Sequence, residues 1–582
     1  MSEAAAAGCV SIDILEYEGG LLRIDGNADG QLLKRGTLSV RINGADVPVH
    51  WSERRAQAVA GKEVFSGRVA FASEICIREL SADNILKFIW RAPDGEERRL
   101  PILAANYQAR LHSDLKKCWW SFGTGRCVYL VTWADDRSLH ASGEPAKNGA
   151  APYALRIRRA GYGRRIRQEL GFLGEILCAE NGSRKMFLMR CQYWLAYPAY
   201  MKKNIWITFD KLYKGGDCGE YFYKYLCSRT ESDIIPVYVI RGDAPDYRRL
   251  QGQGYHPAAY RSKKQRLAYL FASMVFGTHS GVNSFCGFNN WEIRFVQDRL
   301  RAVNTCIQHG LSVQDLSADS NRAVNNNKRY YCASSCEIEN LSRPAYDYAP
   351  ETLRLTGIPR YDGLVNDDRR QILITPTWRA YLAVQSVMGE ARGYNPEFRN
   401  TQYFQLFQSL LDNEKLRACA KECGYRIIYL LHPVISAQKK DFREPEGVKI
   451  CTALDTDYET ILTQSSLMVT DYSGVQFDFA YMRKPVVYFH PKELPPHYGD
   501  GGFDYEKQGF GEICATLDVL VDTLCDYMRR GCSLKEVYRA RQDAFFAYSD
   551  QENCRRIYED ARRYQEEARS RKETVCSVSD SI

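Results

Sequence analysis

The chain has 582 residues, too many for a single hydrophobic core, so roughly two to four domains are expected. With 45% hydrophobic and 26% charged residues it has the composition of an ordinary folded protein, which excludes disorder over most of its length. The net charge of +8 suits an anionic lipid surface or an anionic substrate, and it is too small to indicate nucleic acid as a partner.

Cysteine usage and hydropathy bear on the compartment. The 20 cysteines are thinly spread and include no Cys-x-x-Cys pair, so we expect reduced, mostly buried thiols in a cytoplasmic protein. Residues 1–8 have neither a basic start nor a long apolar run, unlike a signal peptide. No stretch of about 18 apolar residues exists, so the sequence predicts no helix that crosses a bilayer.

Residues 1–155 are predicted to form a β-rich domain. The segments 38–42, 68–72 and 86–90 mostly alternate in side-chain character, as half-buried strands do. Turn-forming sequences such as Asn43-Gly44 separate them. A small sandwich is therefore predicted, and it contains no cluster of catalytic residue types.

Residues 156–203 form a connector in which basic residues stand beside aromatic and apolar ones. Its first arginines are Arg156, Arg158, Arg159, Arg164, Arg165 and Arg167. This combination fits a helix lying on an anionic membrane surface. The other interpretation, slightly favoured, is a connecting helix that packs on the next domain and keeps its basic face in water.

From residue 204 onward strands and helices alternate, which predicts βαβ units and parallel sheets. The first half, 204–350, has strands predicted at 204–209, 234–240, 274–278 and 302–307. The second half, 351–515, has strands predicted at 371–375, 426–431, 447–451, 466–470 and 485–489. Helices and a tail follow at 516–582. The chain is thus expected to contain two doubly wound α/β halves with their carboxyl edges facing each other.

Reactive side chains follow several of these strands. In open α/β sheets ligands bind beyond the carboxyl ends of the strands, so these side chains suggest one shared site. They are His309, Thr377, Arg379, His432, Asp471 and Ser473.

His309 is the candidate general base. It ends a strand and precedes Gly310, and an imidazole in such a place can contribute ~10²–10⁴-fold in rate near neutral pH. A structural histidine is the alternative. The chain has only 9 histidines, and the position of His279, His432 and His490 at further strand ends favours a functional role.

The remaining candidates point to phosphate binding. Arg379 suits bidentate recognition of a phosphate, and the less favoured alternative is a surface arginine packed over Trp378. Ser473, followed by Gly474, begins a helix whose free amides favour an anion, and it could also be a plain N-cap. Asp478 would lie on the inner face of that helix as a substrate anchor or a structural carboxylate.

Together these segments resemble the bacterial CDP-glycerol glycerophosphotransferase family, the poly(glycerol phosphate) or teichoic-acid polymerases and primases. The resemblance covers about residues 200–520. It rests on Ile205-Trp206-Ile207 with Asp210, Asp217-Cys218-Gly219-Glu220-Tyr221, Gln308-His309-Gly310, Thr356 to Asp362, Thr375 to Arg379, His432-Pro433, and Thr470 to Ser473 with Phe477-Asp478.

The resemblance implies a fold and an activity. The fold would be α/β, a GT-B-like pair of doubly wound Rossmann-type halves preceded by the β-rich N-terminal domain. The activity would be transfer of glycerol phosphate from CDP-glycerol to a hydroxyl of a lipid-linked cell-wall or capsule polymer, with release of CMP. The enzyme would be peripheral at the inner face of the cell membrane, held there by 156–203. No cofactor is required, since no carboxylate cluster is placed to hold magnesium.

The resemblance also implies roles for single residues. His309 and His432 would be catalytic, with the base in the acceptor-side half 204–350. The donor would be held by the half 351–515, through Thr377, Arg379, Asp471, Ser473, Gly474 and Asp478. Acceptor-binding or structural roles would fall to Asp210, His279, Gln308, Gly310, Arg360 and Asp362.

Two departures from the family pattern concern anion binding. Members often carry a lysine shortly after Gln-His-Gly, where this chain has Gln314, and a second serine where it has Gly474. The polyol is therefore open, and a CDP-ribitol donor is an alternative. A GT-B glycosyltransferase using a nucleotide sugar, and a non-catalytic scaffold with a glycan-binding sandwich, are the others.

Overall fold

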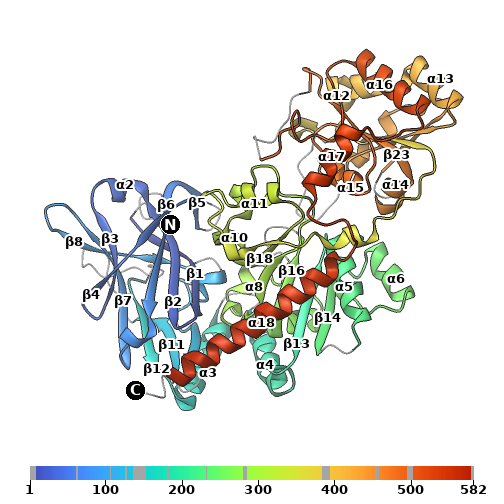
Figure 1. The fold of residues 1–582 in the computed structure, drawn as a ribbon. Coiled ribbons are helices and arrows are strands. Elements are labelled where there is room, and N and C mark those ends of the chain that lie inside the picture. The colour runs from blue at the N-terminus through green and yellow to red at the C-terminus, as the bar shows by residue number, and fades with distance from the viewer. Residues whose placement is uncertain are drawn as a thin grey trace.

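The structure is a computed structural model, and its three parts follow one another along the chain (Figure 1). A β-sandwich comes first, and two α/β halves follow. The residues it describes are 8–60, 63–104, 107–124, 127–134, 152–179, 183–230, 233–278, 285–382, 393–452, 455–456, 458–494 and 502–578.

The N-terminal domain consists of two sheets that share one core. The first has the order β5-β6-β2-β1-β9, and the second β10-β11-β12-β7-β3-β4 with β8 beside β7. The strands of the first are β1 (Val10–Glu18), β2 (Leu21–Asp29), β5 (His50–Ala60), β6 (Glu63–Cys76) and β9 (Ile102–Leu103). Those of the second are β3 (Thr37–Ile42), β4 (Ala45–Pro48), β7 (Asp83–Arg91), β8 (Glu97–Leu100), β10 (Trp119–Thr124), β11 (Cys127–Trp133) and β12 (Leu155–Arg159).

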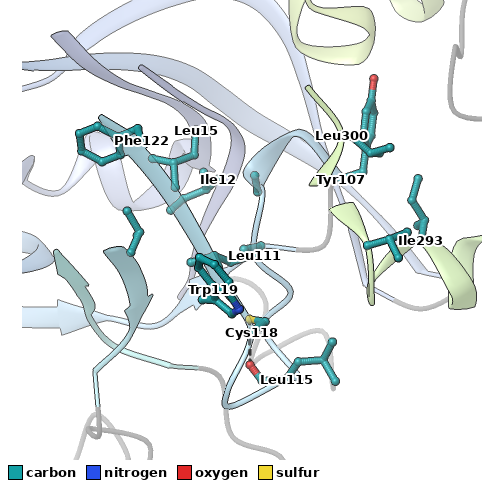
Figure 2. Packing of buried hydrophobic residues seen from close by; sticks show 14 of the residues in the cluster. Ile12, Leu15, Tyr107, Leu111, Leu115, Cys118, Trp119, Phe122, Ile293 and Leu300 are labelled. Atoms are coloured by element: carbon teal, nitrogen blue, oxygen red, sulfur yellow. Dashed lines mark hydrogen bonds between the residues drawn. The ribbon is translucent and has the colours of Figure 1, made fainter. Parts of the chain in front are cut away.

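The predicted β-rich domain is confirmed, and its alternating segments lie in β3, β6 and β7. The short helix α2 (Gly30–Lys34) joins β2 to β3. Every second residue of β3 is buried, which is the period-two pattern seen in the sequence. The sandwich core continues into the next domain: Figure 2 shows Trp119 and Tyr107 in the same buried cluster as Ile293 and Leu300.

The connector begins later than expected. Arg156, Arg158 and Arg159 lie in β12, because this segment completes the second sheet between β11 and β7. Two helices then follow, α3 (Tyr162–Cys178) and α4 (Ser183–Tyr200).

A buried ion network fastens these helices to the first α/β half. Arg190 of α4 donates to Glu169 of α3 at 2.5 and 2.7 Å, and to both oxygens of Asp298 at 2.8 Å. Trp119 of the sandwich donates to the same glutamate at 2.7 Å. The connector therefore packs on its neighbours on both sides.

In its described residues, the first α/β half has seven parallel strands in the order β15-β14-β13-β16-β17-β18-β19. The strands are β13 (Asn204–Phe209), β14 (Ile234–Ile240), β15 (Ala258–Ala259), β16 (Ala272–Gly277), β17 (Val303–Cys306), β18 (Asn327–Cys332) and β19 (Leu353–Leu355). Its helices are α5 (Cys218–Ser228), α6 (Pro245–Gly252), α7 (Lys263–Phe271), α8 (Asn290–Ile293), α9 (Ser317–Ser320), α10 (Arg322–Asn325) and α11 (Ser335–Leu341).

The part of the second half that the structure describes has six parallel strands in the order β22-β21-β20-β23-β24-β25. The strands are β20 (Gln371–Ile374), β21 (Arg426–Leu430), β22 (Val448–Cys451), β23 (Ser465–Thr470), β24 (Val486–Phe489) and β25 (Ile513–Cys514). Its helices are α12 (Gln402–Asp412), α13 (Glu414–Glu422), α14 (Tyr458–Gln464) and α15 (Val475–Tyr481).

Both halves have the doubly wound order of a Rossmann-type fold, and the predicted GT-B-like pair is confirmed. In each sheet the chain order reverses next to the first strand, between β13 and β16 and between β20 and β23. Such a switch point is where an open α/β sheet forms its ligand site.

Each strand predicted after residue 204 overlaps an observed one, but four of the described strands, β15, β18, β19 and β25, were missed. β15 and β25 have two residues each, too few to show a pattern. β18 begins Asn327-Lys328-Arg329 and β19 has three residues, so neither shows an apolar run. The stretch between β20 and β21 contains two helices, because Asn413 ends α12 and caps α13.

The C-terminal helices are α16 (Leu517–Arg529), α17 (Glu536–Phe545) and α18 (Asn553–Val578). In Figure 1, α18 runs from the second half back across the first half toward the sandwich. Cys554, Ile557 and Ala561 of α18 lie in a core cluster that contains residues of both halves. This helix therefore joins the two halves. Within the described residues, no helix is long and apolar enough to cross a membrane.

Candidate active site

The site is built around the close packing of β13 on the start of α5. Asp210, directly after β13, is buried and accepts hydrogen bonds from Gly219 N at 2.7 Å and Glu220 N at 3.0 Å. A Cβ on Gly219 would lie 2.4 Å from Phe209 O, so only glycine fits there. Burial raises the pKa of Asp210 to about 8. Asp210 thus acts as a structural anchor that fixes the first turn of α5.

His309 meets Asp217, the N-cap residue of α5. Its Nδ1 lies 2.5 Å from Asp217 Oδ2, and the other carboxylate oxygen accepts from Cys218 N at 2.8 Å and from Arg360 Nη1 at 2.8 Å. Arg360 also donates to the backbone oxygen of His309. The imidazole side chain is 48% exposed, so it can reach a bound molecule.

Arg360 connects this group to the second half. Its Nε and Nη2 donate to the two carboxylate oxygens of Asp478 on α15, at 2.9 and 3.0 Å. Gln314, five residues after His309, donates to Tyr472 O at 3.4 Å. The carboxyl ends of β17 and β23 are therefore tied together across the boundary between the halves.

The charges of this group fix the protonation of the pair. Burial works to raise the pKa of Asp217, but the interactions with His309 and Arg360, including their hydrogen bonds, outweigh it and hold this pKa far below its usual value. Desolvation lowers the pKa of His309 against the attraction of Asp217, and the positive charge of Lys211 lowers it further. Because Asp217 is ionised, it accepts the Nδ1 proton, which makes Nε2 the basic nitrogen of a neutral imidazole.

Burial raises the pKa of Asp478 to about 6, although Arg360 opposes this change. Arg360 itself stays charged, since the two carboxylates raise its pKa well above the usual value. The guanidinium is thus held between two acids, one from each half.

The residues beside His309 have supporting roles. Gln308 is buried in a left-handed conformation, with φ of 57°, and its Nε2 donates to Tyr331 O at 2.6 Å and Glu337 Oε1 at 2.7 Å. A Cβ on Gly310 would meet open space. The unusual backbone that presents His309 is therefore at Gln308, where buried hydrogen bonds hold it.

A second group of contacts lies at the ends of β20 and β23. Asp471 accepts from Thr377 N at 2.7 Å and from Arg379 Nη2 at 2.8 Å. Arg379 also donates to Thr377 O at 2.8 Å and Leu494 O at 3.0 Å, and it is 2% exposed. In this structure the guanidinium holds two loops together at the switch point of the second sheet.

His432, Ser473 and Gly474 lie in the same half. The ring of His432 is 6.0 Å from that of Trp378, and its Nδ1 accepts from Val434 N at 3.2 Å. Ser473 is half-buried, and Gly474 is the exposed N-cap residue of α15. His309 and His432 thus belong to two different groups of contacts, linked through Arg360, α15 and Tyr472.

The remaining candidate residues are Asp362, His490 and His279. Asp362 accepts from the backbone amides of Asn553 and Cys554, both at 2.8 Å, so it caps the start of α18. His490 stacks on Tyr472 at 4.3 Å. His279 lies outside the described residues. The part of the chain that the structure describes contains no group of three or more His, Cys, Asp or Glu placed to hold a metal ion.

Sequence reasoning missed the roles of Asp217 and Lys211. Asp217 was noticed only as part of a motif, although an aspartate before a helix that follows a strand is a recognisable cap at a ligand edge. Lys211 is a cation directly after Asp210, and burial lowers its pKa. A search for charged residues after β13 would have found both.

Two facing Rossmann-type halves with an Asp–His pair at the strand ends define a GT-B-like protein with a candidate acid–base centre. The chain belongs to the CDP-Glycerol:Poly(glycerophosphate) glycerophosphotransferase family, whose profile matches residues 196–561.

Curated relatives from Bacillus subtilis (strain 168) include the minor teichoic acid biosynthesis protein GgaB. It is 31% identical over 412 residues, which are 69% of this chain and 45% of that protein. A teichoic acid poly(glycerol phosphate) polymerase is 27% identical over 30% of this chain and 24% of its own length. The chain spans less than half the length of the curated relatives it matches. Among solved structures, the wall teichoic acid polymerase TagF is similar with a TM-score of 0.46 and 16% identity, over 70% of this chain and 99% of that one.

Proposed function

We propose that this chain transfers glycerol phosphate from CDP-glycerol to a hydroxyl of a lipid-linked cell-wall polymer and releases CMP. The observation that carries this assignment is the contact of 2.5 Å between Asp217 Oδ2 and His309 Nδ1. The two residues lie at the carboxyl edge of the first parallel sheet, in a chain that belongs to the glycerophosphotransferase family. Such a pair positions a neutral imidazole to accept a proton.

In the reaction, His309 Nε2 takes the proton of the acceptor hydroxyl while the hydroxyl oxygen attacks the phosphorus that carries glycerol. The bond from this phosphorus to the bridging oxygen breaks, and CMP leaves with that oxygen. Phosphoryl transfer depends mostly on positioning and electrostatics. Asp217 fixes the ring through Nδ1, and Arg360 fixes Asp217, so the base is held before substrate binds.

The donor is assigned to the second half, where Thr377, Arg379, Asp471 and His432 lie at the ends of β20, β21 and β23. In this structure Arg379 donates a hydrogen bond to Asp471. It would therefore bind the diphosphate by replacing one of its present hydrogen bonds, or it would act indirectly by fixing the loop that carries Thr377. His432, Ser473 and Gly474 are the further donor-side residues of this assignment.

The acceptor is membrane-linked in this proposal, and α3 supports a membrane-surface location. Tyr162, Ile166, Leu170 and Leu177 are exposed, and their spacing puts them on one face of the helix. Arg164 and Arg167 belong to the same helix. An exposed apolar stripe beside arginines suits the headgroup region of an anionic leaflet.

The decisive experiment combines a donor panel with a base variant. Wild-type protein incubated with a lipid-linked acceptor should release CMP from CDP-glycerol and add glycerol phosphate to the product mass. His309→Ala should lose most turnover and keep its folding transition. Normal CMP release by this variant would remove the base assignment, while use of CDP-ribitol or of a nucleotide sugar alone would replace the donor.

The membrane assignment has its own test. The double variant Ile166→Glu, Leu170→Glu should sediment less with anionic vesicles than wild type does. Equal sedimentation of the two proteins would refute the role of α3.

A further inference from the structure

A basic cavity lies between α4 and the start of α7, away from the residues assigned to catalysis. It has a volume of about 250 Å³. Its lining residues are Lys185, Leu188, Met189 and Gln192 of α4, with Arg261, Lys263 and Arg266. We infer that this cavity binds the phosphate headgroup of an anionic membrane phospholipid.

Charge is the first reason. Four of the seven lining side chains are cationic, and none is acidic. Glu292, behind the cavity, pairs with Arg266 at 3.1 Å and lies 3.9 Å from Lys185. Within the described residues, neither Arg261 nor Lys263 forms an ion pair with a carboxylate. Two cations are therefore left to attract an anion.

The backbone at the cavity adds to this potential. Arg261 adopts a left-handed conformation, with φ of 63°, which is uncommon for a residue with a side chain. It precedes Ser262, whose Oγ caps α7 by accepting from Gln265 N at 3.1 Å. The positive end of the α7 dipole thus lies next to the side chains of Arg261 and Lys263.

The apolar part of the lining indicates a lipid rather than a free anion. Leu188 is 57% exposed, and Leu195, seven residues later on the same face of α4, is 82% exposed. A phosphate in the cavity would therefore leave its attached chains beside exposed leucines.

This inference rests on the membrane-surface location proposed above, and it adds a specific site to it. The α3 stripe would give general attachment, whereas the cavity would recognise phosphate. Anchoring α4 at a fixed headgroup would set the height of the first α/β half above the bilayer, since Arg190 ties α4 to that half.

Short-chain lipids that stay monomeric separate this cavity from general surface attachment. Dihexanoyl phosphatidylglycerol should bind wild-type protein, and the double variant Arg261→Gln, Lys263→Gln should weaken this binding about thirty-fold. Each basic residue contributes about 1 kcal/mol, and about 1.4 kcal/mol corresponds to a tenfold change in affinity. Lys415→Gln, Lys421→Gln on α13 is the matched control and should change binding less than twofold. Equal weakening by the control, or full binding by the cavity variant, would overturn the site.

Inorganic phosphate and Leu188→Asn distinguish a lipid from a free anion. Inorganic phosphate should bind more weakly than the short-chain lipid, and Leu188→Asn should weaken only the lipid. Equal affinity for both ligands would replace the lipid with a soluble phosphate. CMP release measured with a detergent-dispersed acceptor reports separately on transfer: the cavity variant should keep it, and His309→Ala should keep lipid binding.

Discussion

Asp217→Asn is the sharpest test of the Asp–His pair. The asparagine side chain can still accept from Cys218 N, which keeps the cap of α5, and it can still accept from Arg360. Its amide group, however, would donate to His309 Nδ1 instead of accepting from it. The imidazole would then carry its proton on Nε2, where the base must be unprotonated.

The expected loss follows from this tautomer change. A general base contributes ~10²–10⁴-fold in rate, and the wrong tautomer removes the whole contribution. At 1.36 kcal/mol per tenfold, this corresponds to about 2.7–5.4 kcal/mol of transition-state stabilisation. The KM for the donor should change little, because Asp217 lies in the acceptor-side half.

The assay is CMP release as a function of pH. Wild-type activity should rise through an acid limb below about pH 6.5, since the pKa of His309 is lowered from its usual value, and it should be flat at neutral pH. Asp217 works to raise that pKa, so in Asp217→Asn the limb should move to lower pH while the plateau falls. Asp243→Asn, which removes a charge from an exposed pair with Arg241, is the control and should match wild type. Full turnover with an unmoved acid limb in Asp217→Asn would refute the positioning role.

Three further predictions concern the framework, and each is measured by denaturant unfolding. Gly219→Ala should cost about 1–3 kcal/mol because its Cβ would press on Phe209 O, whereas Gly174→Ala on exposed α3 should be neutral or gain up to about 1 kcal/mol. Arg360→Met should cost about 3–5 kcal/mol, since it leaves the buried Asp478 without its cation and removes one of the partners of Asp217, and an unchanged midpoint would contradict the coupling of the halves. Asp362→Ala should cost about 0.5–2 kcal/mol through the lost cap of α18, and an equal loss in Asp362→Asn would argue against capping.

The fold was largely predictable because apolar runs and helical segments alternate after residue 204. Strands such as β13 are buried on both faces and read as continuous apolar segments. β18 escaped notice because its first residues are polar, and tertiary contacts bury them: Arg329 pairs with Asp560 of α18 at 3.1 Å. The sequence alone places Arg156 in the connector, because its pairing with Asp83, 73 residues earlier, has no local signal.

The site was predictable only as a set of residue types at strand ends. His309 was found in this way, but its partner Asp217 lies 92 residues earlier, and only the folded sheet brings them together. The partner of Arg379 could not be predicted either. An arginine side chain binds a phosphate and a carboxylate equally well, and here it pairs with the buried carboxylate of Asp471.

The distribution of cations bears on how a diphosphate would be held between the halves. In the second half Arg379 is engaged by Asp471, and in the first half Gln314 is neutral and donates to Tyr472 O. Lys211 is a cation of the first half, and its charge lowers the pKa of His309. Since Arg360 holds His309, Asp217 and α15 together, binding of the donor and alignment of the base would depend on the same contact between the halves.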